Sequence, residues 1–270
     1  SAAIFPESDS TLEEASRYKL DRICQKLDLQ PGDQVVEIGT GWGGFALHAA
    51  AEYGCHVTTT TISSEQYERA RQQIDAAGLS DRITLLFEDY RNLTGRYDKL
   101  VSIEMIEAVG PQYLGEYTGR INDLLKPDGL ALIQAITLPD QRYERALKNV
   151  DFIQRYIFPG SFIPSMGAIL EAFRDHSDMV FSHAEDIGLH YARTLACWAE
   201  GFESNLDAIR ALGYSESFIR LWRYYFAYCE AGFAERCIGN VQLLMTKPDN
   251  RRPNIIAGGN LLSPRRDLRA

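Results

Sequence analysis

The residues with the clearest chemical potential form a glycine-rich turn after a short apolar segment. The segment 34–38 contains Glu37, and the turn Gly39-Thr40-Gly41-Trp42-Gly43-Gly44 precedes a helical pattern over 45–53. Glycines let a backbone approach a ligand closely and adopt positive φ at no steric cost. The Gly-x-Gly-x-Gly spacing differs from the Gly-x-Gly-x-x-Gly of dinucleotide sites, whose pyrophosphate needs a helix N-terminus. The turn therefore predicts a site for a nucleoside without phosphates, such as a sulfonium nucleoside, with Glu37 offering a carboxylate to the cation. A tight strand-to-helix turn without a ligand is the alternative.

Bulk composition excludes several classes of function. Of 270 residues, 45% are hydrophobic and 24% are charged, which is ordinary for one large or two small globular domains. The net charge of −9 argues against broad nucleic-acid binding, because phosphate contacts need a basic surface. Five cysteines are scattered without a Cys-x-x-Cys pair, so we expect reduced thiols and no metal site. No apolar run reaches the ~18 residues that span a bilayer and no signal-peptide pattern is present, so we expect a cytoplasmic location. Because the first residue is Ser1 and not Met, we expect the natural chain to begin further upstream.

Helix and strand patterns alternate over the first half of the chain. Thr11 and Glu14 form a capping-box pattern for a helix that runs to Leu27. Further helices are predicted over 45–53, 65–77 and 112–125, and strands over 34–38, 56–62, 83–88, 99–104 and 130–137. This alternation predicts an α/β fold with a doubly wound, mainly parallel sheet. Ligands bind at the carboxyl ends of such strands. That edge would carry residues 37–44, 61–63, 89–90, 104–107 and 134–136.

The alternation stops at Pro139. From there to Arg236 the sequence shows helical patterns and no strand, and 139–238 hold 18 of the 29 aromatic residues. A strand pattern over 240–246 would return to the sheet. Insertions of this length are usually functional, so we interpret 139–238 as a helical lid over an apolar substrate; a layer packed for stability is the alternative. The single domain, 1–270, would comprise an N-terminal helical segment (1–30), a ligand-binding α/β core (31–138 and 239–248), the lid (139–238) and a flexible tail (249–270).

Six ordered motifs resemble those of the cyclopropane fatty-acyl-phospholipid synthase family of S-adenosylmethionine-dependent enzymes, along nearly the whole chain. They are Val36–Gly44, Thr61–Gln66, Asp89–Arg91, Met105–Pro111, Tyr156–Gly160 and Tyr191–Leu195. The run Glu-Met-Ile-Glu-Ala-Val-Gly, here 104–110, is similar to the branch of plant-type cyclopropane synthases and many bacterial relatives. The resemblance implies a class I methyltransferase fold: a seven-stranded Rossmann-like sheet with a large helical insertion before the last strand.

By this resemblance, the carboxyl edge of the sheet would bind S-adenosylmethionine and release S-adenosylhomocysteine. Gln66 would hydrogen-bond ribose hydroxyls in place of the usual acid, and a helix-capping role is its alternative. Glu104 would steady the donor or face solvent. The residues expected at the donor are Glu37, Gly39, Gly41, Gly43, Thr61, Ile62, Gln66, Asp89, Tyr90 and Glu104.

The resemblance also implies a catalytic centre that holds a bicarbonate ion as base, with a Cys, a Glu, a His, an Ile main chain and a Tyr as ligands. Here the Glu, Ile and Tyr correspond to Glu107, Ile136 and Tyr191. The Cys position falls near Ala2, and the His position falls on Gln134, which can hydrogen-bond an anion but carries no charge. These two departures leave open whether bicarbonate binds or Glu107 acts directly as the base.

The implied reaction transfers a methyl(ene) group to the double bond of an unsaturated fatty acyl chain and forms a cyclopropane ring. A carbocation would develop on that chain, and the aromatic faces of Tyr191, Tyr225 and Tyr228 are candidates to stabilise it. Three alternatives stay open: a lipid C-methyltransferase that leaves a methyl or methylene branch, a small-molecule methyltransferase of the same fold, and a non-catalytic binding module. We expect an acyl lipid as partner and no nucleic acid. A homodimer and a peripheral contact with the inner membrane face, to which the arginines of the tail could contribute, also stay open.

Overall fold

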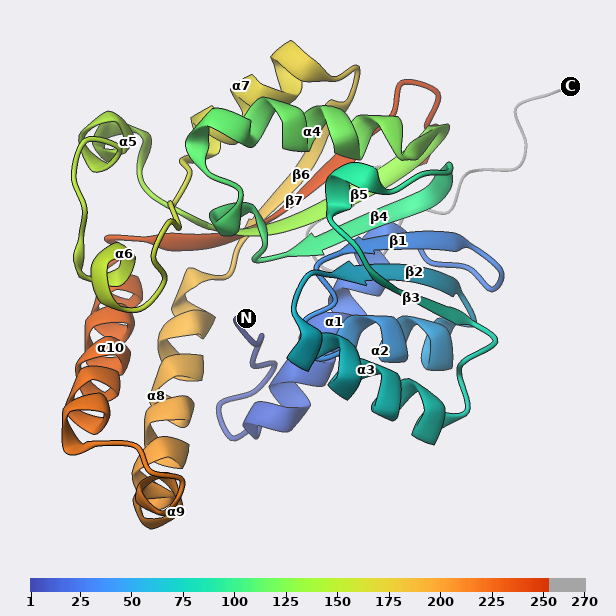
Figure 1. Cartoon of the computed structure of the whole chain (residues 1–270). Helices are drawn as coiled ribbons and strands as arrows, with labels where there is room; N and C mark the ends of the chain where they lie inside the picture. The colour runs from blue at the N-terminus through green and yellow to red at the C-terminus, as the bar shows by residue number, and fades with distance from the viewer. Residues whose placement is uncertain (253–270) are drawn as a thin grey trace, which may run out of the picture.

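A seven-stranded sheet organises residues 1–252, the part of the chain that this computed structural model describes (Figure 1). The strand order is β3-β2-β1-β4-β5-β7-β6. Strands β1 to β5 pair in parallel, and β7 pairs antiparallel with both β5 and β6. The predicted doubly wound, mainly parallel sheet with seven strands is thus confirmed. The strands are β1 (Gln34–Ile38), β2 (His56–Thr61), β3 (Ile83–Phe87), β4 (Tyr97–Ile103), β5 (Leu125–Thr137), β6 (Val180–Asp186) and β7 (Gly239–Thr246).

Helices cover both faces of the sheet. Helices α1, α2 and α3 pack on one face, and α4 and α7 pack on the other (Figure 1). Helices α5, α6, α8, α9 and α10 lie beyond the end of the sheet. The helices are α1 (Leu12–Leu27), α2 (Gly44–Tyr53), α3 (Ser64–Ala77), α4 (Leu114–Asp123), α5 (Asp140–Ala146), α6 (Phe152–Tyr156), α7 (Met166–His176), α8 (Gly188–Ser204), α9 (Leu206–Ala211) and α10 (Glu216–Ala234). Three short 3₁₀ turns are η1 (Tyr90–Asn92), η2 (Ile106–Ala108) and η3 (Pro111–Tyr113).

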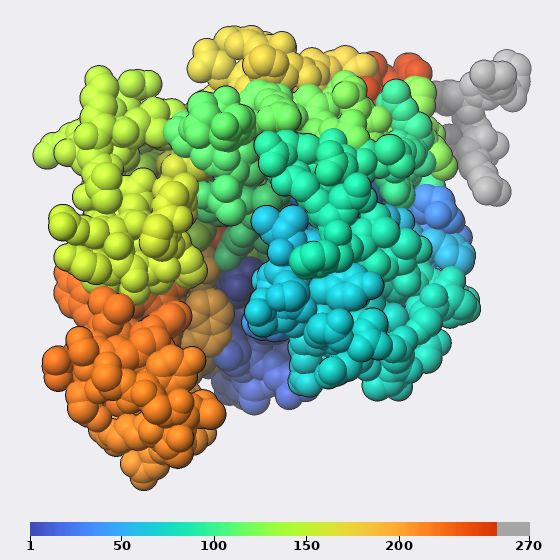
Figure 2. Space-filling model, viewed as in Figure 1, coloured from blue at the N-terminus to red at the C-terminus, as the bar shows by residue number. Residues whose placement is uncertain are grey.

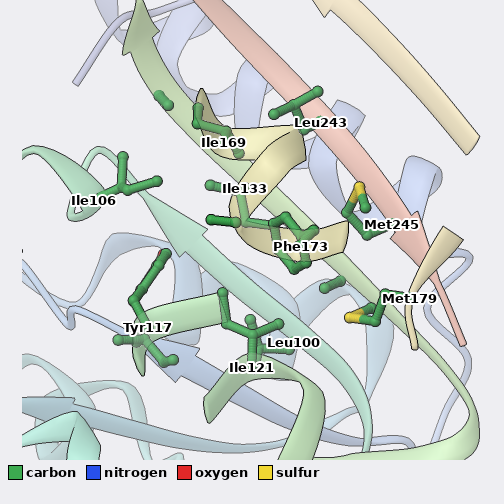
Figure 3. Close-up of a cluster of buried hydrophobic side chains, with 14 of the residues drawn as sticks. Leu100, Ile106, Tyr117, Ile121, Ile133, Ile169, Phe173, Met179, Leu243 and Met245 are labelled. Atoms are coloured by element: carbon green, nitrogen blue, oxygen red, sulfur yellow. The ribbon is translucent and has the colours of Figure 1, made fainter. Parts of the chain in front are cut away.

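Alternation along the central strands divides the core in two. Ile133 of β5 packs with Phe173 of α7 and Tyr117 of α4 (Figure 3). Its neighbour Leu132 joins the opposite cluster, which contains residues of α1, α2 and α3. Since side chains alternate along a strand, Gln134 shares the α1 face with Leu132.

Capping residues and a glycine determine where two of the helices begin or end. The capping box of Thr11 and Glu14 is present: the Glu14 N–H donates to Thr11 Oγ1 (3.2 Å), and the Thr11 N–H donates to Glu14 Oε2 (2.8 Å). Helix α3 begins after Ser63, whose hydroxyl accepts the Gln66 N–H (3.2 Å), and ends at Gly78 with φ 66°. The predicted elements are therefore present, with ends that differ by a few residues.

Strand β6 corrects the prediction that 139–236 contain no strand. Its sequence, Val-Phe-Ser-His-Ala-Glu-Asp, lacks apolar–polar alternation, and much of it is exposed. Pairing with β7 at the sheet edge holds it extended. Residues 139–238 are therefore mainly helical, with one edge strand.

The surface is hollowed between these helices and the α/β core. In Figure 2 the hollow separates the orange and yellow-green atoms of 139–238 from the cyan and teal atoms of the α2–β3 region, and dark-blue N-terminal atoms lie at its base. Aromatic side chains of α8 and α10, with Ala2 and Ile4, form a third apolar cluster on the inner side. The role of 139–238 as a lid stays a prediction.

Three further findings concern the described residues. Between residues 1 and 252, no helix combines the length and apolarity that crossing a bilayer requires. In the same part of the chain, no group of three or more His, Cys, Asp or Glu side chains is arranged to hold a metal ion. All five cysteines are free thiols. Most of the predicted flexible tail, 253–270, lies outside the described residues.

Candidate active site

The glycine turn after β1 is open on the side that a ligand would occupy. Gly39, Gly41 and Gly43 have backbone φ angles of 100°, 54° and 91°, which residues other than glycine rarely adopt. A Cβ on Gly41 would meet no atom within 4 Å, whereas a Cβ on Gly39 would lie 3.2 Å from Met105 Cγ. The space beside Gly41 can therefore receive a nucleoside close to the backbone.

Glu37 lies beneath this turn and is 2% exposed. Its Oε2 accepts the hydroxyl of Thr59 (2.7 Å), which lies 2.7 Å from the Thr40 hydroxyl. Burial raises the pKa of Glu37 to about 8, against the hydrogen bond from Thr59 and the charge of the buried Lys19. A cation bound near Glu37 would favour its ionised form.

The end of β2 presents a polar pair and an exposed apolar residue. Thr61 Oγ1 donates to Gln66 Oε1 (2.7 Å), so the Gln66 amide nitrogen is free to donate to a ligand. Ser63 is the N-cap of α3, and its hydroxyl accepts a hydrogen bond from the main-chain N–H of Gln66, not from the Gln66 side chain. Capping therefore does not occupy the Gln66 side chain. Ile62 is 73% exposed and can cover a flat ring.

Asp89 and Tyr90 follow β3 at the same edge. Both carboxylate oxygens of Asp89 accept from the Arg91 guanidinium (2.9 Å each), and this partner holds the pKa of Asp89 below its usual value. The Tyr90 ring meets the ring of Tyr117 edge-on, with centroids 5.7 Å apart. Asp89 is thus held by its neighbour, and Tyr90 is anchored in the core.

Glu104, directly after β4, is the most constrained residue of the site. It is not a glycine, yet its φ is 51°, a strained conformation that surrounding contacts must maintain. The side chain is 10% exposed, so it does not face solvent. Four groups donate to its carboxylate: the Ala2 N–H (2.9 Å), Gln134 Nε2 (2.8 Å) and Asn240 Nδ2 (2.7 Å) to Oε1, and the Tyr191 hydroxyl (2.9 Å) to Oε2.

These donors determine the charge of Glu104. Burial raises the pKa of Glu104, whereas the hydrogen bonds from Ala2 and Gln134 and the charge of Lys19 lower it. Because all four hydrogen-bond partners donate to its carboxylate, the ionised form of Glu104 is favoured.

For Glu107, the effects that raise the pKa exceed those that lower it. Its Oε1 accepts the Ile136 N–H (2.6 Å), while its buried Oε2 has no hydrogen-bond partner among residues 1–252. Burial and the charge of Glu104 raise the pKa of Glu107 to about 8, and the Ile136 hydrogen bond opposes them. The two carboxyl groups thus titrate in different ranges, as acid–base pairs in active sites do.

The structure brings all four predicted catalytic residues together. Glu107 contacts Ile136, and Gln134 and Tyr191 both donate to Glu104. The Tyr191 ring stacks on Phe233 at 4.4 Å between centroids. Of the other candidate aromatics, Tyr225 is 8% exposed in the same cluster, whereas Tyr228 is 42% exposed.

Two features of the site did not emerge from the sequence. Glu104 was expected to steady the methyl donor or to face solvent; it does not face solvent, and its hydrogen bonds from Gln134 and Tyr191 were not predicted. Asn240 was not predicted as a site residue, although it is fully buried and donates to the same oxygen as Ala2. A polar residue at the start of an apolar strand was the only signal for Asn240.

Comparison with known proteins gives concordant matches. Residues 1–243 match the family model described as mycolic acid cyclopropane synthetase. The tuberculostearic acid methyltransferase of Mycobacterium tuberculosis is 42% identical over 219 residues, 81% of this chain and 51% of that protein. The cyclopropane-fatty-acyl-phospholipid synthase of Escherichia coli is 36% identical over 248 residues, 92% of this chain and 62% of that protein. This chain thus spans between half and two thirds of the length of these relatives.

One solved structure extends the comparison to the fold. A mycolic acid cyclopropane synthase in complex with SAH and CTAB superposes with a TM-score of 0.84 at 28% identity, covering 92% of this chain and 89% of that one.

Proposed function

Because this chain belongs to the mycolic acid cyclopropane synthetase family, we propose that it uses S-adenosylmethionine to add a methylene unit to the double bond of an unsaturated fatty acyl chain, forming a cyclopropane ring. The observation that carries the proposal is the pair of buried carboxyl groups, Glu104 and Glu107, at the carboxyl end of the parallel sheet and in contact with Gln134, Ile136 and Tyr191. A relative named as a cyclopropane synthase and a similar structure solved with SAH support it.

The donor site is suited to this nucleoside. The space beside Gly41 would take the methionine part, the free amide nitrogen of Gln66 would donate to a ribose hydroxyl, and Ile62 would cover the adenine. S-adenosylhomocysteine would leave the same site as product. When bound, the donor supplies an electrophilic methyl group.

Glu107 is the base in this proposal. Once the alkene carbon has taken the methyl group, one proton of that methyl must leave so that its C–H electron pair can close the ring. Oε2 of Glu107 is the one carboxylate oxygen of the pair without a hydrogen-bond partner among the described residues, and so it can accept that proton. A base works best when its pKa lies near the working pH, and the pKa of Glu107 is about 8.

Glu104 supplies the fixed negative charge. A carbocation near it would be stabilised by an anion that is already oriented and kept from water, which is the most effective form of electrostatic catalysis. The implied bicarbonate does not fit this arrangement, because its expected ligands Gln134 and Tyr191 already donate to Glu104. We therefore derive no step through bicarbonate.

The aromatic cluster of α8 and α10 would border the acyl chain. Tyr191, Trp198 and Phe233 present apolar surface directly beside the tyrosine hydroxyl that contacts Glu104. Apolar walls around a reacting cation also exclude water that would otherwise quench it. Access to a lipid acyl chain would bring the protein to the membrane surface as a peripheral contact, and a homodimer stays open.

A second candidate is a lipid C-methyltransferase that leaves a methyl or methylene branch. It is favoured by the higher identity to the tuberculostearic acid methyltransferase, 42% against 36% for the cyclopropane synthase. The same cation yields a methylene branch when a proton is lost without ring closure.

One experiment tests the proposal and separates the two candidates. The protein is incubated with S-adenosylmethionine and vesicles of monounsaturated phospholipid, and the released fatty acids are analysed by mass spectrometry before and after catalytic hydrogenation. A product heavier by one CH₂ that takes up no hydrogen indicates the ring, and one that takes up hydrogen indicates a methyl or methylene branch with a remaining double bond. Donor binding without a product from any lipid would refute both and leave a binding module.

Gly41→Ala should weaken donor binding at least tenfold, because its Cβ would enter the open space beside the turn. Isothermal titration with S-adenosylhomocysteine measures the effect. Gly32→Ala is the matched control: Gly32 also has positive φ (87°) and no atom within 4 Å of a Cβ, but it lies in the turn before β1. Both variants lose about 1–2 kcal/mol through strain. Equal donor affinities would contradict the donor placement.

Turnover should rise with pH through about 8, because only the ionised form of Glu107 can take the proton. Glu107→Gln should abolish turnover at every pH and leave donor binding intact. Glu104→Gln removes the charge that raises the pKa of Glu107, so the rising limb should move to lower pH while the plateau falls. Initial rates across a pH series, with donor binding as a check of folding, measure both. A rising limb unmoved by Glu104→Gln would refute the electrostatic coupling.

Removal of bicarbonate should leave the rate unchanged, because Glu104 occupies the donors that bicarbonate would need. Rates are compared in buffer purged of carbon dioxide under argon and in the same buffer with added bicarbonate. A rate that collapses on purging and returns on addition would show that an exogenous anion is required.

A further inference from the structure

Polar side chains cross three neighbouring strands at one level of the sheet. Gln242 of β7 is in register with Gln134 of β5 on one side and with Glu185 of β6 on the other. Both glutamines are fully buried on the face that α1 covers. Lys26 of α1, 4% exposed, contacts both Glu185 and Gln242. Buried polar groups in such a row require partners, and these side chains supply one another.

The hydrogen bonds along this row run in one direction and end at the candidate active site. Lys26 Nζ donates to Gln242 Oε1 (2.6 Å), Gln242 Nε2 donates to Gln134 Oε1 (3.0 Å), and Gln134 Nε2 donates to Glu104 Oε1 (2.8 Å). We name these four residues the amide relay. An ammonium group only donates and a carboxylate only accepts. The two ends therefore impose one orientation on both amides.

We propose that Lys26 is a positioning residue for the transfer reaction, acting on Glu104 through Gln242 and Gln134. The relay joins a positive and a negative end through two aligned amide dipoles, and aligned hydrogen bonds polarise one another in a low dielectric. Lys26 thereby keeps the Gln134 amide turned toward Glu104 and supports Glu104 as an anion. This inference rests on the proposed function.

The ion pair with Glu185 is one of two polar side-chain contacts of Lys26 within residues 1–252. Glu185 is already paired with Arg22, whose Nη2 lies 2.8 Å from both carboxylate oxygens. Neutralising Glu185 therefore does not require burial of a second cation, which carries a desolvation cost. The other side-chain hydrogen bond of Lys26 among the described residues is to Gln242, the first amide of the relay.

Lys247 provides a matched comparison within the same sheet. It is also buried (7% exposed), and it also bonds one carboxylate and one amide oxygen, Asp178 Oδ1 and Asn122 Oδ1. It follows β7 at the opposite end, and its partners make no hydrogen bond to the candidate active site among residues 1–252. Lys26→Met and Lys247→Met thus remove equivalent groups, of which only one belongs to the relay.

The test compares steady-state kinetics of the two variants with monounsaturated phospholipid vesicles. Lys26→Met should lower kcat about tenfold, the effect of losing one charge-assisted hydrogen bond, with an unchanged dissociation constant for S-adenosylhomocysteine. Lys247→Met should keep the wild-type kcat. In a Gln134→Leu background, Lys26→Met should have no further effect on kcat, because the relay is already broken. Equal kcat for both lysine variants, or a full additional effect in the Gln134→Leu background, would overturn the inference while leaving the proposed function intact.

Gln242→Glu covers the case in which Lys26→Met does not fold. The new carboxylate keeps a partner for Lys26 but cannot donate to Gln134 Oε1. We expect at least a tenfold lower kcat with an unchanged dissociation constant for S-adenosylhomocysteine, and a wild-type kcat would overturn the inference.

Failure of the proposed function would be recognised separately, as a wild-type protein that forms no product from any lipid. The relay is then tested by urea unfolding of Lys26→Met, Gln134→Leu and the double variant. Non-additive shifts support coupling through the relay, and additive shifts overturn it.

Discussion

An ionised carboxylate held away from water is the constraint on which the rest of this structure depends. Glu104 adopts a left-handed backbone conformation at φ 51°, at a cost of about 1–3 kcal/mol for such strain. Its four donors come from four separate segments: the N-terminal strip, β5, β7 and α8. The hydrogen bonds of Glu104 therefore connect the α/β core with helix α8. Loss of the charge would leave four buried donors facing a weaker acceptor.

The two-residue period of the strands delivers these donors to one place. On the α1 face of β5, Leu130 and Leu132 are apolar and Gln134 is polar. On β7, which runs in the opposite direction, Leu244 is apolar and Gln242 and Asn240 are polar. The polar parts of β5 and β7 lie side by side because the register of the two strands pairs Gln134 with Gln242 and Ile136 with Asn240. One sheet thus supplies an apolar core at one end and a hydrogen-bonded site at the other.

Sequence patterns predicted the parts of this protein that are defined locally. Helix α3 lies between its cap Ser63 and Gly78, and the turn glycines have the positive φ for which glycine is selected. Strand β6 was missed because pairing with β7, and not its own alternation, keeps it extended. The placement of Glu104 was also beyond sequence reasoning, since its partners lie 30, 87, 102 and 136 positions away. At the positions where the resemblance implies a Cys and a His, the main-chain N–H of Ala2 and the amide of Gln134 both donate to Glu104.

The segment 187–238, which forms α8, α9 and α10, leaves the sheet after Asp186 of β6 and rejoins it at Gly239 of β7, and Asp186 pairs with Val241 of that strand. Segments whose ends are held side by side tolerate changes in length with little entropic penalty. The loop region around α9 can therefore change in length while the register of β6 with β7 is kept. Changes in length can therefore be introduced there with the strands left as they are.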